Sequence, residues 1–257
     1  MILSKRVALG DVQLDELHEA IVIRSINPGV PHENITAVSR MGGSGQRVTG
    51  QHWESLDVTV TYAIDIPKRE MSLRRQIFDT VNAWAARRGW LTVNQMQNRK
   101  MYVDKVIFPS GGDMWDWLSE YTLTFRSYNV PFWQDITPAQ AVSGITNNGS
   151  ISLAVPGILT TTMDAYFENK SGMTINNFRI TAGGNEIRLS SLGLGGTETL
   201  AINHGGDGLL QIKIGSRSVY HKYTGNDDLY VNPGPVGVSF SAERAGILTA
   251  YAWGRYV

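Results

Sequence analysis

Alternating apolar and polar positions predict that the first half of the chain is built mainly from β-strands. The clearest run lies within residues 47–66, where apolar side chains from Val58 to Ile66 alternate with mainly Asp and Thr side chains. This period of two is typical of a sheet with one apolar and one polar face. Further strands are predicted at residues 7–14, 20–26, 34–39, 99–108 and 115–128.

One amphipathic helix is predicted between these strands, over residues 72–88. Its apolar side chains recur three or four positions apart and therefore share one face; they are Leu73, Ile77, Val81, Trp84 and Ala85. Ser72 is the predicted N-cap, and Gly89 is expected to end the helix in the left-handed conformation. The expected order is strands, one helix, and further strands.

The second part of the chain has no helical period and predicts a β-sandwich or jelly roll. Of the 27 glycines, 18 follow residue 135, and they separate short strand patterns such as residues 218–223, 236–242 and 248–256. The small, polar residues 143–150 are typical of a linker or a first turn. We therefore predict a mainly β protein with an N-terminal domain over residues 1–138 and a C-terminal β-sandwich over residues 139–257.

The amino-acid composition excludes several classes of protein. The 257 residues include 23 basic and 23 acidic side chains, so a basic nucleic-acid clamp is not expected. The absence of cysteine excludes disulfides, thiolate catalysis and cysteine-ligated metal sites. No apolar run reaches the roughly 18 residues that a membrane span needs, and Lys5 and Arg6 stand where a signal peptide would be apolar. We expect a soluble, unprocessed chain with no membrane partner.

Motifs that carry catalysis are missing, and the sequence predicts neither an enzyme nor a cofactor or metal site. Neither His18 nor His32 is followed by a second histidine at the spacing of a helical zinc site. The run from Gly42 to Gly45 lacks the last glycine of a nucleophile elbow. A glycosidase is an alternative only if the fold places acidic side chains such as Asp227 and Asp228 across a cleft.

Two groups of residues are candidates for binding. Asp57, Thr59, Thr61 and Asp65 form a polar sheet face whose opposite side packs on the helix; an ordinary solvated face is the alternative. Aromatic and acidic side chains also gather around a glycine turn, as they do on sugar-binding surfaces, with Tyr220, Tyr223, Asp227 and Tyr230 as the candidate glycan contacts. Half-buried strand tyrosines are the alternative for this second group.

Residues 72–133 carry a more specific pattern. The helix contains Asn82-Ala83-Trp84 and is followed by Gly89-Trp90-Leu91, a strand over residues 99–106, and a closing strand that leads into Val130-Pro131-Phe132-Trp133. This pattern resembles the N-terminal domain of siphophage distal tail (Dit) proteins. The glycine-rich second part, which ends in an aromatic stretch over residues 250–256, is similar to the C-terminal domain of that family.

The resemblance implies a structural virion protein at the phage tail tip, made in the cytoplasm of the host bacterium. Distal tail proteins form a hexameric ring that joins the major tail (tube) protein to a tail-associated, fibre or hub protein, and their outer domains dock adsorption apparatus such as a receptor-binding protein. The family implies a tail-tube-like β-barrel with an outer helix, followed by a galectin-like or jelly-roll sandwich. This sandwich lacks the His, Asn and Arg pattern of sugar-binding galectins, so protein contacts are expected from it.

Two sites are predicted within such a ring. Asp57, Thr59, Thr61 and Asp65 are expected to line the channel, because acidic and hydroxyl side chains let DNA pass without the phosphate binding that lysines give. A glycine-rich loop is expected to become ordered against an adjacent ring; its residues are Arg40, Met41, Gly42, Gly43, Ser44, Gly45, Gln46 and Arg47. The alternative function is a carbohydrate-binding adhesion protein that acts through the C-terminal β-sandwich.

Overall fold

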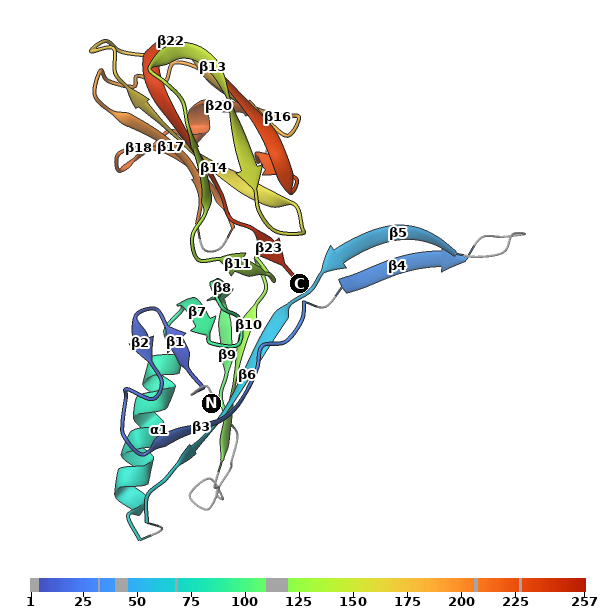
Figure 1. The fold of residues 1–257 in the computed structure, drawn as a ribbon, viewed down its shortest axis with the longest axis vertical. Helices are drawn as coiled ribbons and strands as arrows, with labels where there is room; N and C mark the ends of the chain where they lie inside the picture. Colours follow the sequence, from blue (N-terminus) through green and yellow to red (C-terminus); the bar gives the residue numbers. More distant parts are fainter. Residues whose placement is uncertain are drawn as a thin grey trace. The chain divides into compact units, whose positions relative to one another are not determined.

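The computed structural model describes residues 5–31, 33–39, 46–67, 69–109, 120–205, 208–226 and 228–257. The chain divides into two compact units, Met1–Trp133 and Gln134–Val257. Both units consist mainly of β-strands (Figure 1), and α1 (Met71–Ala85) is the only α-helix among the described residues. The mainly β fold class predicted from the sequence is therefore confirmed.

The N-terminal unit contains two larger groups of paired strands and a separate hairpin. In chain order its strands are β1 (Val7–Leu9), β2 (Val12–Gln13), β3 (Ile21–Asn27), β4 (Glu33–Ser39), β5 (Gln46–Trp53), β6 (Leu56–Ile64), β7 (Gly89–Val93), β8 (Arg99–Val103), β9 (Lys105–Ile107) and β10 (Tyr121–Ser127), followed by the start of β11 (Trp133–Asp135). The antiparallel orders are β2-β1-β7-β8 and β3-β6-β10-β9, and β4 pairs with β5.

The core of this unit lies between α1 and the sheets. The Trp84 ring of α1 packs edge-on against Phe125 of β10, with centroids 5.9 Å apart, and its Nε1 donates a 3.1 Å hydrogen bond to the carbonyl of Val12 in β2. Tyr62 of β6 stacks on Tyr121 of β10 at 5.4 Å. Because the apolar side chains of β6 are buried in this core, the predicted one-sided character of the strand is confirmed.

Several local predictions for this unit are wrong. Residues 7–14 and 99–108, each predicted as one strand, form two strands each, and β8 and β9 belong to different sheets. Residues 47–66 form two strands, because the chain leaves β5 at Trp53 and begins β6 at Leu56 in a different sheet. The helix begins at Met71 after Glu70, whose carbonyl accepts the Arg74 N–H at 3.0 Å, so Ser72 lies inside the first turn and is not the N-cap. Gly89 has a φ of 152° and opens β7, so it does not end the helix in the left-handed helical conformation.

The C-terminal unit is a two-layer β-sandwich. After β11 its elements are β12 (Ala139–Val142), β13 (Thr146–Val155), β14 (Thr161–Asn169), β15 (Phe178–Ala182), β16 (Asn185–Leu189), β17 (Thr199–His204), β18 (Leu210–Ile214), β19 (Arg217–Ser218), the 3-10 turn η2 (Tyr220–Lys222), β20 (Tyr223–Gly225), β21 (Tyr230–Val231), β22 (Gly234–Ala252) and β23 (Arg255–Tyr256). The sandwich confirms the predicted fold of the second part.

One long strand, β22, belongs to both layers of the sandwich. Its first half pairs with β13 and β15, and its second half, from Gly246, pairs with β14 and β12. The layers are therefore β13-β22-β15-β16-β20 and β12-β22-β14-β17-β18-β19. Phe167 of β14 packs against Phe178 of β15 and Phe240 of β22, with centroids 4.8 and 5.7 Å apart, so the two layers share one core.

Several strand boundaries in this unit differ from the prediction. Residues 143–150 are not a linker, because most of them belong to β13, which pairs along β22. Residues 236–242 and 248–252 belong to one continuous strand, although the Glu-Arg-Ala-Gly sequence between them is typical of a turn. Gly246 permits this continuity, since a Cβ there would stand 2.4 Å from Phe167. Residues 220–222, predicted as strand, form η2.

Candidate functional site

The polar face of the β3-β6-β10-β9 sheet is the first candidate site. Thr59 of β6 lies in register between Asn27 of β3 and Thr124 of β10. One step along the same face, the hydroxyls of Thr61 and Thr122 are 3.2 Å apart, within hydrogen-bonding distance. The apolar positions between these residues point into the core, so the hydroxyl-bearing face is the one directed away from it.

An ion pair stands at one end of this polar face. Arg126 of β10 lies directly opposite Asp57 of β6 and donates from Nε to Oδ1 at 2.6 Å and from Nη2 to Oδ2 at 2.5 Å. These bonds, together with a further one to the Tyr128 hydroxyl, raise the pKa of Arg126. Because the Asp57 carboxylate is neutralised by its partner, hydroxyl groups rather than acidic groups dominate the chemistry of the face.

Asp65 lies apart from the other three predicted channel residues. Strand β6 ends at Ile64, and the Asp65 N–H donates to the carbonyl of Ala20 at 2.8 Å. Ala63, which continues the polar side of the strand in sequence, is only 4% exposed. The face therefore brings together Asp57, Thr59 and Thr61, and their place along a channel stays a prediction.

Gly29 supports the strand end that carries Asp57. Its φ is +65°, and a Cβ at this position would stand 1.9 Å from the Asp57 carbonyl oxygen. We expect Gly29→Ala to lower the free energy of unfolding of the N-terminal unit by about 1–3 kcal/mol more than Gly10→Ala does. Gly10 is the matched control, because its φ is +62° and no atom lies within 4 Å of its Cβ position. Equal losses for the two variants in urea unfolding would contradict this account.

The predicted ring-stacking loop falls largely outside the described residues. Residues 40–45 are not described, and Gln46 and Arg47 begin β5. The flanking strands form the β4-β5 hairpin, which pairs from Glu33 with Trp53 to Ser39 with Gln46 (Figure 1). The role of residues 40–47 therefore stays a prediction.

The predicted glycan residues have different partners in the C-terminal unit. Tyr220 and Tyr223 pack together with ring centroids 5.3 Å apart, and the Tyr223 hydroxyl donates to the carbonyl of Asn226. Tyr230 on β21 instead donates its hydroxyl to Asp228 Oδ2 at 2.8 Å. Asp227 lies outside the described residues. Glycan binding at these four positions stays a prediction.

A buried histidine between two carboxylates is a feature that sequence reasoning missed. His204, at the end of β17, has its Nδ1 2.8 Å from Asp164 Oδ1 and its Nε2 2.8 Å from Asp228 Oδ1. The side chains of His204 and Asp164 are 6% and 7% exposed, and that of Asp228 is 16% exposed. Asp164 and Asp228 lie 40 and 24 positions from His204, so no local motif could have indicated the cluster.

The cluster favours the charged form of His204. Burial acts to lower the pKa of His204, whereas hydrogen bonds to Asp164 and Asp228 act to raise it, and the net result is a raised pKa. Tyr230 donates its hydroxyl to Asp228. Burial and the charge of Asp164 raise the pKa of Tyr166. Burial lowers the pKa of Arg255, and the charge of Asp228 acts against this effect. Both ring nitrogens of His204 contact carboxylates, so neither is free to activate a nucleophile, and the cluster acts as an internal ion network.

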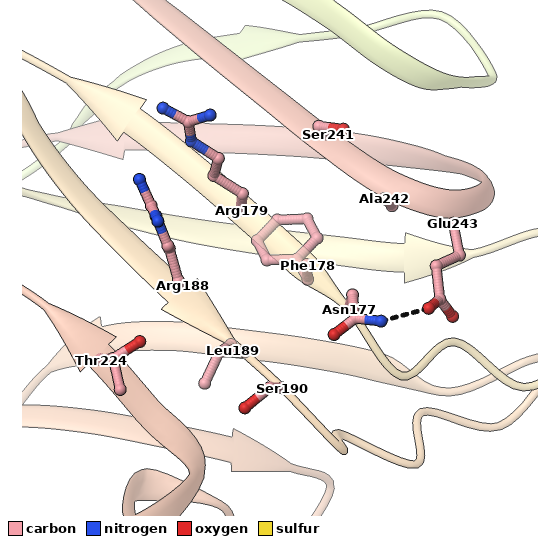
Figure 2. A pocket seen from close by; sticks show the side chains of 10 residues that line it. All are labelled: Asn177, Phe178, Arg179, Arg188, Leu189, Ser190, Thr224, Ser241, Ala242 and Glu243. Carbon is pink, nitrogen blue, oxygen red and sulfur yellow. Dashed lines mark hydrogen bonds between the residues drawn. The ribbon is translucent and has the colours of Figure 1, made fainter.

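An open pocket of about 360 Å³, called the groove below, lies on one sandwich layer, and Figure 2 shows the side chains that line it. Its lining comes from β15, β16, β20 and β22 and comprises Asn177, Phe178, Arg179, Arg188, Leu189, Ser190, Thr224, Ser241, Ala242 and Glu243. Figure 2 shows Arg179 and Arg188 on neighbouring strands, with Asn177 bonded to Glu243. The sequence did not indicate this groove, because its polar residues alternate with core residues on separate strands.

Two further properties bear on the class of protein. Within the described ranges, no three His, Asp or Glu side chains are grouped so that they could hold a metal ion. The helix that the structure describes is too short and too polar to cross a membrane.

Comparisons with known proteins find a similar fold among solved structures. No family model matches the chain, and no curated protein matches it in sequence. Among solved structures, the chain is similar to SPP1 Dit, described as a paradigm of the hub adsorption apparatus in phages that infect Gram-positive bacteria. The TM-score is 0.65 at 12% identity, over 97% of this chain and 98% of that one.

Two chains of the phage P2 baseplate in its activated conformation, with Ca and with Sr, are less similar. Their TM-scores are 0.48 and 0.49 at 8% and 9% identity, over 96% of this chain and 97% of theirs. The fold assignment rests on the first structure alone. At the level of the fold, the resemblance to distal tail proteins predicted from the sequence is confirmed.

Proposed function

We propose that the chain is a structural distal tail protein that closes into a hexameric ring at the tip of a phage tail. The observation that carries this proposal is the fold shared with SPP1 Dit over 97% of the chain. The ring would join the major tail (tube) protein to a tail-associated, fibre or hub protein, with residues 1–138 forming the ring and residues 139–257 forming its outer domain. The protein would be made in the host cytoplasm and reside in the virion.

The polar sheet face suits the wall of a channel through which DNA passes. The threonine hydroxyls and the neutralised Asp57–Arg126 pair add no net positive charge to this face, and exposed Lys105 of β9 stands opposite Arg126 at the edge of the sheet. We expect a face with so few cations to hold the phosphate backbone weakly, so DNA would cross. We propose no catalytic step and no cofactor. Both ring nitrogens of the buried His204 contact carboxylates, so this side chain is not available as a catalytic base. Residues 40–47 would contact the adjacent ring, and a receptor-binding protein would dock on the outer domain.

Lysines on the polar face should convert the channel into a DNA-binding surface. We expect Thr59→Lys/Thr61→Lys to form the same ring but to retain duplex DNA at low salt, because each subunit then adds two cations to the lumen. Gel-shift and filter-binding assays of the purified ring would measure this. Gln76→Lys/Thr80→Lys adds the same two cations on the exposed side of α1; it is the matched control and should leave DNA binding much weaker. Equal retention by both variants would contradict the channel assignment.

A further inference from the structure

Two arginines face each other on the outer surface of the sandwich. Arg179 of β15 and Arg188 of β16 are direct cross-strand partners, and their side chains are 55% and 62% exposed. Like charges directly opposite one another destabilise a sheet unless something offsets them. An anionic group that contacts both arginines would therefore stabilise this pair.

Glu186 is an anionic partner of both arginines, but it uses only some of their N–H donors. One carboxylate oxygen accepts from Arg188 Nε and the other from Arg179 Nη2. Hydrogen bonds from Arg188 and Arg179 lower the pKa of Glu186. Each guanidinium carries five N–H donors, and the remaining donors of these two arginines have no other partner within the described part of the chain. Arg179, Arg188 and Glu186 together carry one net positive charge, which the charged Glu243 at the other end of the groove offsets.

The groove beside this pair is lined by neutral hydrogen-bonding groups. Asn177, Ser190, Thr224 and Ser241 contribute amide and hydroxyl side chains. The acidic residue of the groove, Glu243, is already engaged, because it accepts the Asn176 N–H at 2.9 Å and the Asn177 amide. These bonds lower the pKa of Glu243, so its carboxylate is charged. Figure 2 shows it at the end of the groove away from the two guanidinium groups. The volume of about 360 Å³ lies within the range of small-ligand sites.

We propose that this groove binds one unit of an acidic saccharide, with its carboxylate or phosphate held by the N–H donors of Arg179 and Arg188 that Glu186 does not use. Guanidinium groups bind such anions through paired N–H donors, and the serine, threonine and asparagine side chains would bond the hydroxyl groups. The groove fits a small polar ligand better than a protein. None of the large apolar side chains exposed among the described residues belongs to its lining, whereas protein interfaces depend on such anchors.

Calorimetric titration of the full chain at low salt tests this site. The probes are an oligosaccharide that contains glucuronate, a glucose oligosaccharide that carries phosphate groups, and a neutral glucose oligosaccharide of the same length. We expect at least one acidic probe to bind and the neutral probe to bind about tenfold more weakly or not at all. The two acidic probes distinguish a carboxylate ligand from a phosphate ligand.

Variants then place the binding at the groove. Arg179→Gln and Arg188→Gln should each weaken the acidic probe about tenfold while leaving the melting temperature nearly unchanged, since both side chains are exposed. Arg217→Gln removes the same charge from β19, outside the groove, and should bind like the parent chain. The inference is overturned if neither acidic saccharide binds, if the neutral one binds equally well, or if the groove variants keep full affinity. It is also overturned if a glutamate-rich peptide, titrated in the same way, binds more tightly than both acidic saccharides. None of these results depends on ring formation. A failure of the saccharide site would therefore not count against the proposed hexameric ring, and the reverse also holds.

Discussion

His204→Ala should destabilise the C-terminal unit by about 3–5 kcal/mol, which is the loss expected when one partner of a buried ion pair is removed. The variant leaves the carboxylates of Asp164 and Asp228 in a site where each had a contact of 2.8 Å to the imidazole. Two like charges would then face each other with little access to water. Urea unfolding followed by hydrogen exchange of the β17 amides measures the loss.

The same cluster predicts how stability depends on pH. The folded pKa of His204 lies above its ordinary value of 6.5, so the folded state binds the proton more tightly than the unfolded state does. The stabilising contribution is therefore complete below pH 6.5 and is lost as the pH rises through the raised pKa. The difference in unfolding free energy between the parent chain and His204→Ala should accordingly shrink at alkaline pH.

A control separates this effect from the general loss of a histidine. His221 is exposed on η2, and His221→Ala should change the free energy of unfolding by less than about 0.5 kcal/mol at every pH. If His204→Ala and His221→Ala gave the same stability and the same pH profile, the buried network would have no energetic role.

Asn169→Ala should be the second large loss, about 3 kcal/mol for the C-terminal unit. Asn169 is fully buried at the end of β14. Its amide nitrogen donates to the carbonyls of Met173 at 2.7 Å and Gly195 at 2.9 Å, and its oxygen accepts from the N–H and hydroxyl of Ser171 at 3.0 and 2.7 Å. Alanine would remove all four of these hydrogen bonds and leave a space where the fully buried amide stood, although Ser171 and the Met173 carbonyl keep a bond to each other. The shift in the urea midpoint reports the loss.

The matched substitution for this test is Asn148→Ala. Asn148 is exposed on β13, and only its backbone takes part in the hydrogen bonds with Thr146. We expect a change within about 0.5 kcal/mol. A similarly small change for Asn169→Ala would mean that the turn between β14 and β15 does not depend on this side chain.

Features of the fold that depend on local periodicity could be predicted from the sequence. The alternation in β6 correctly separated Val58, Val60 and Tyr62 from the polar face, because side chains in a strand point alternately to opposite sides. The helix was located for the same reason, since its buried side chains Ile77, Val81 and Trp84 recur at helical spacing. The mainly β fold and the likeness to distal tail proteins were also predicted correctly.

Features that depend on pairing between distant strands could not be predicted. Asp65 continues the alternation of β6 in sequence, but the strand ends at Ile64. Gly246 has the composition of a turn, yet the close approach of Phe167 makes it part of a continuous strand. His204 meets its two carboxylates only because β14, β17 and the segment before β21 converge. The candidate groove arises in the same way, from alternate positions on four strands.

We propose that this chain forms a closed hexameric ring, and the native mass of the purified protein tests this most directly. Light scattering coupled to size exclusion, over a range of concentrations, should give six times the 28.4 kDa of one chain, and negative-stain images should show a six-fold ring with a central hole. A monomer at every concentration, or a closed assembly of a different symmetry, would contradict the account.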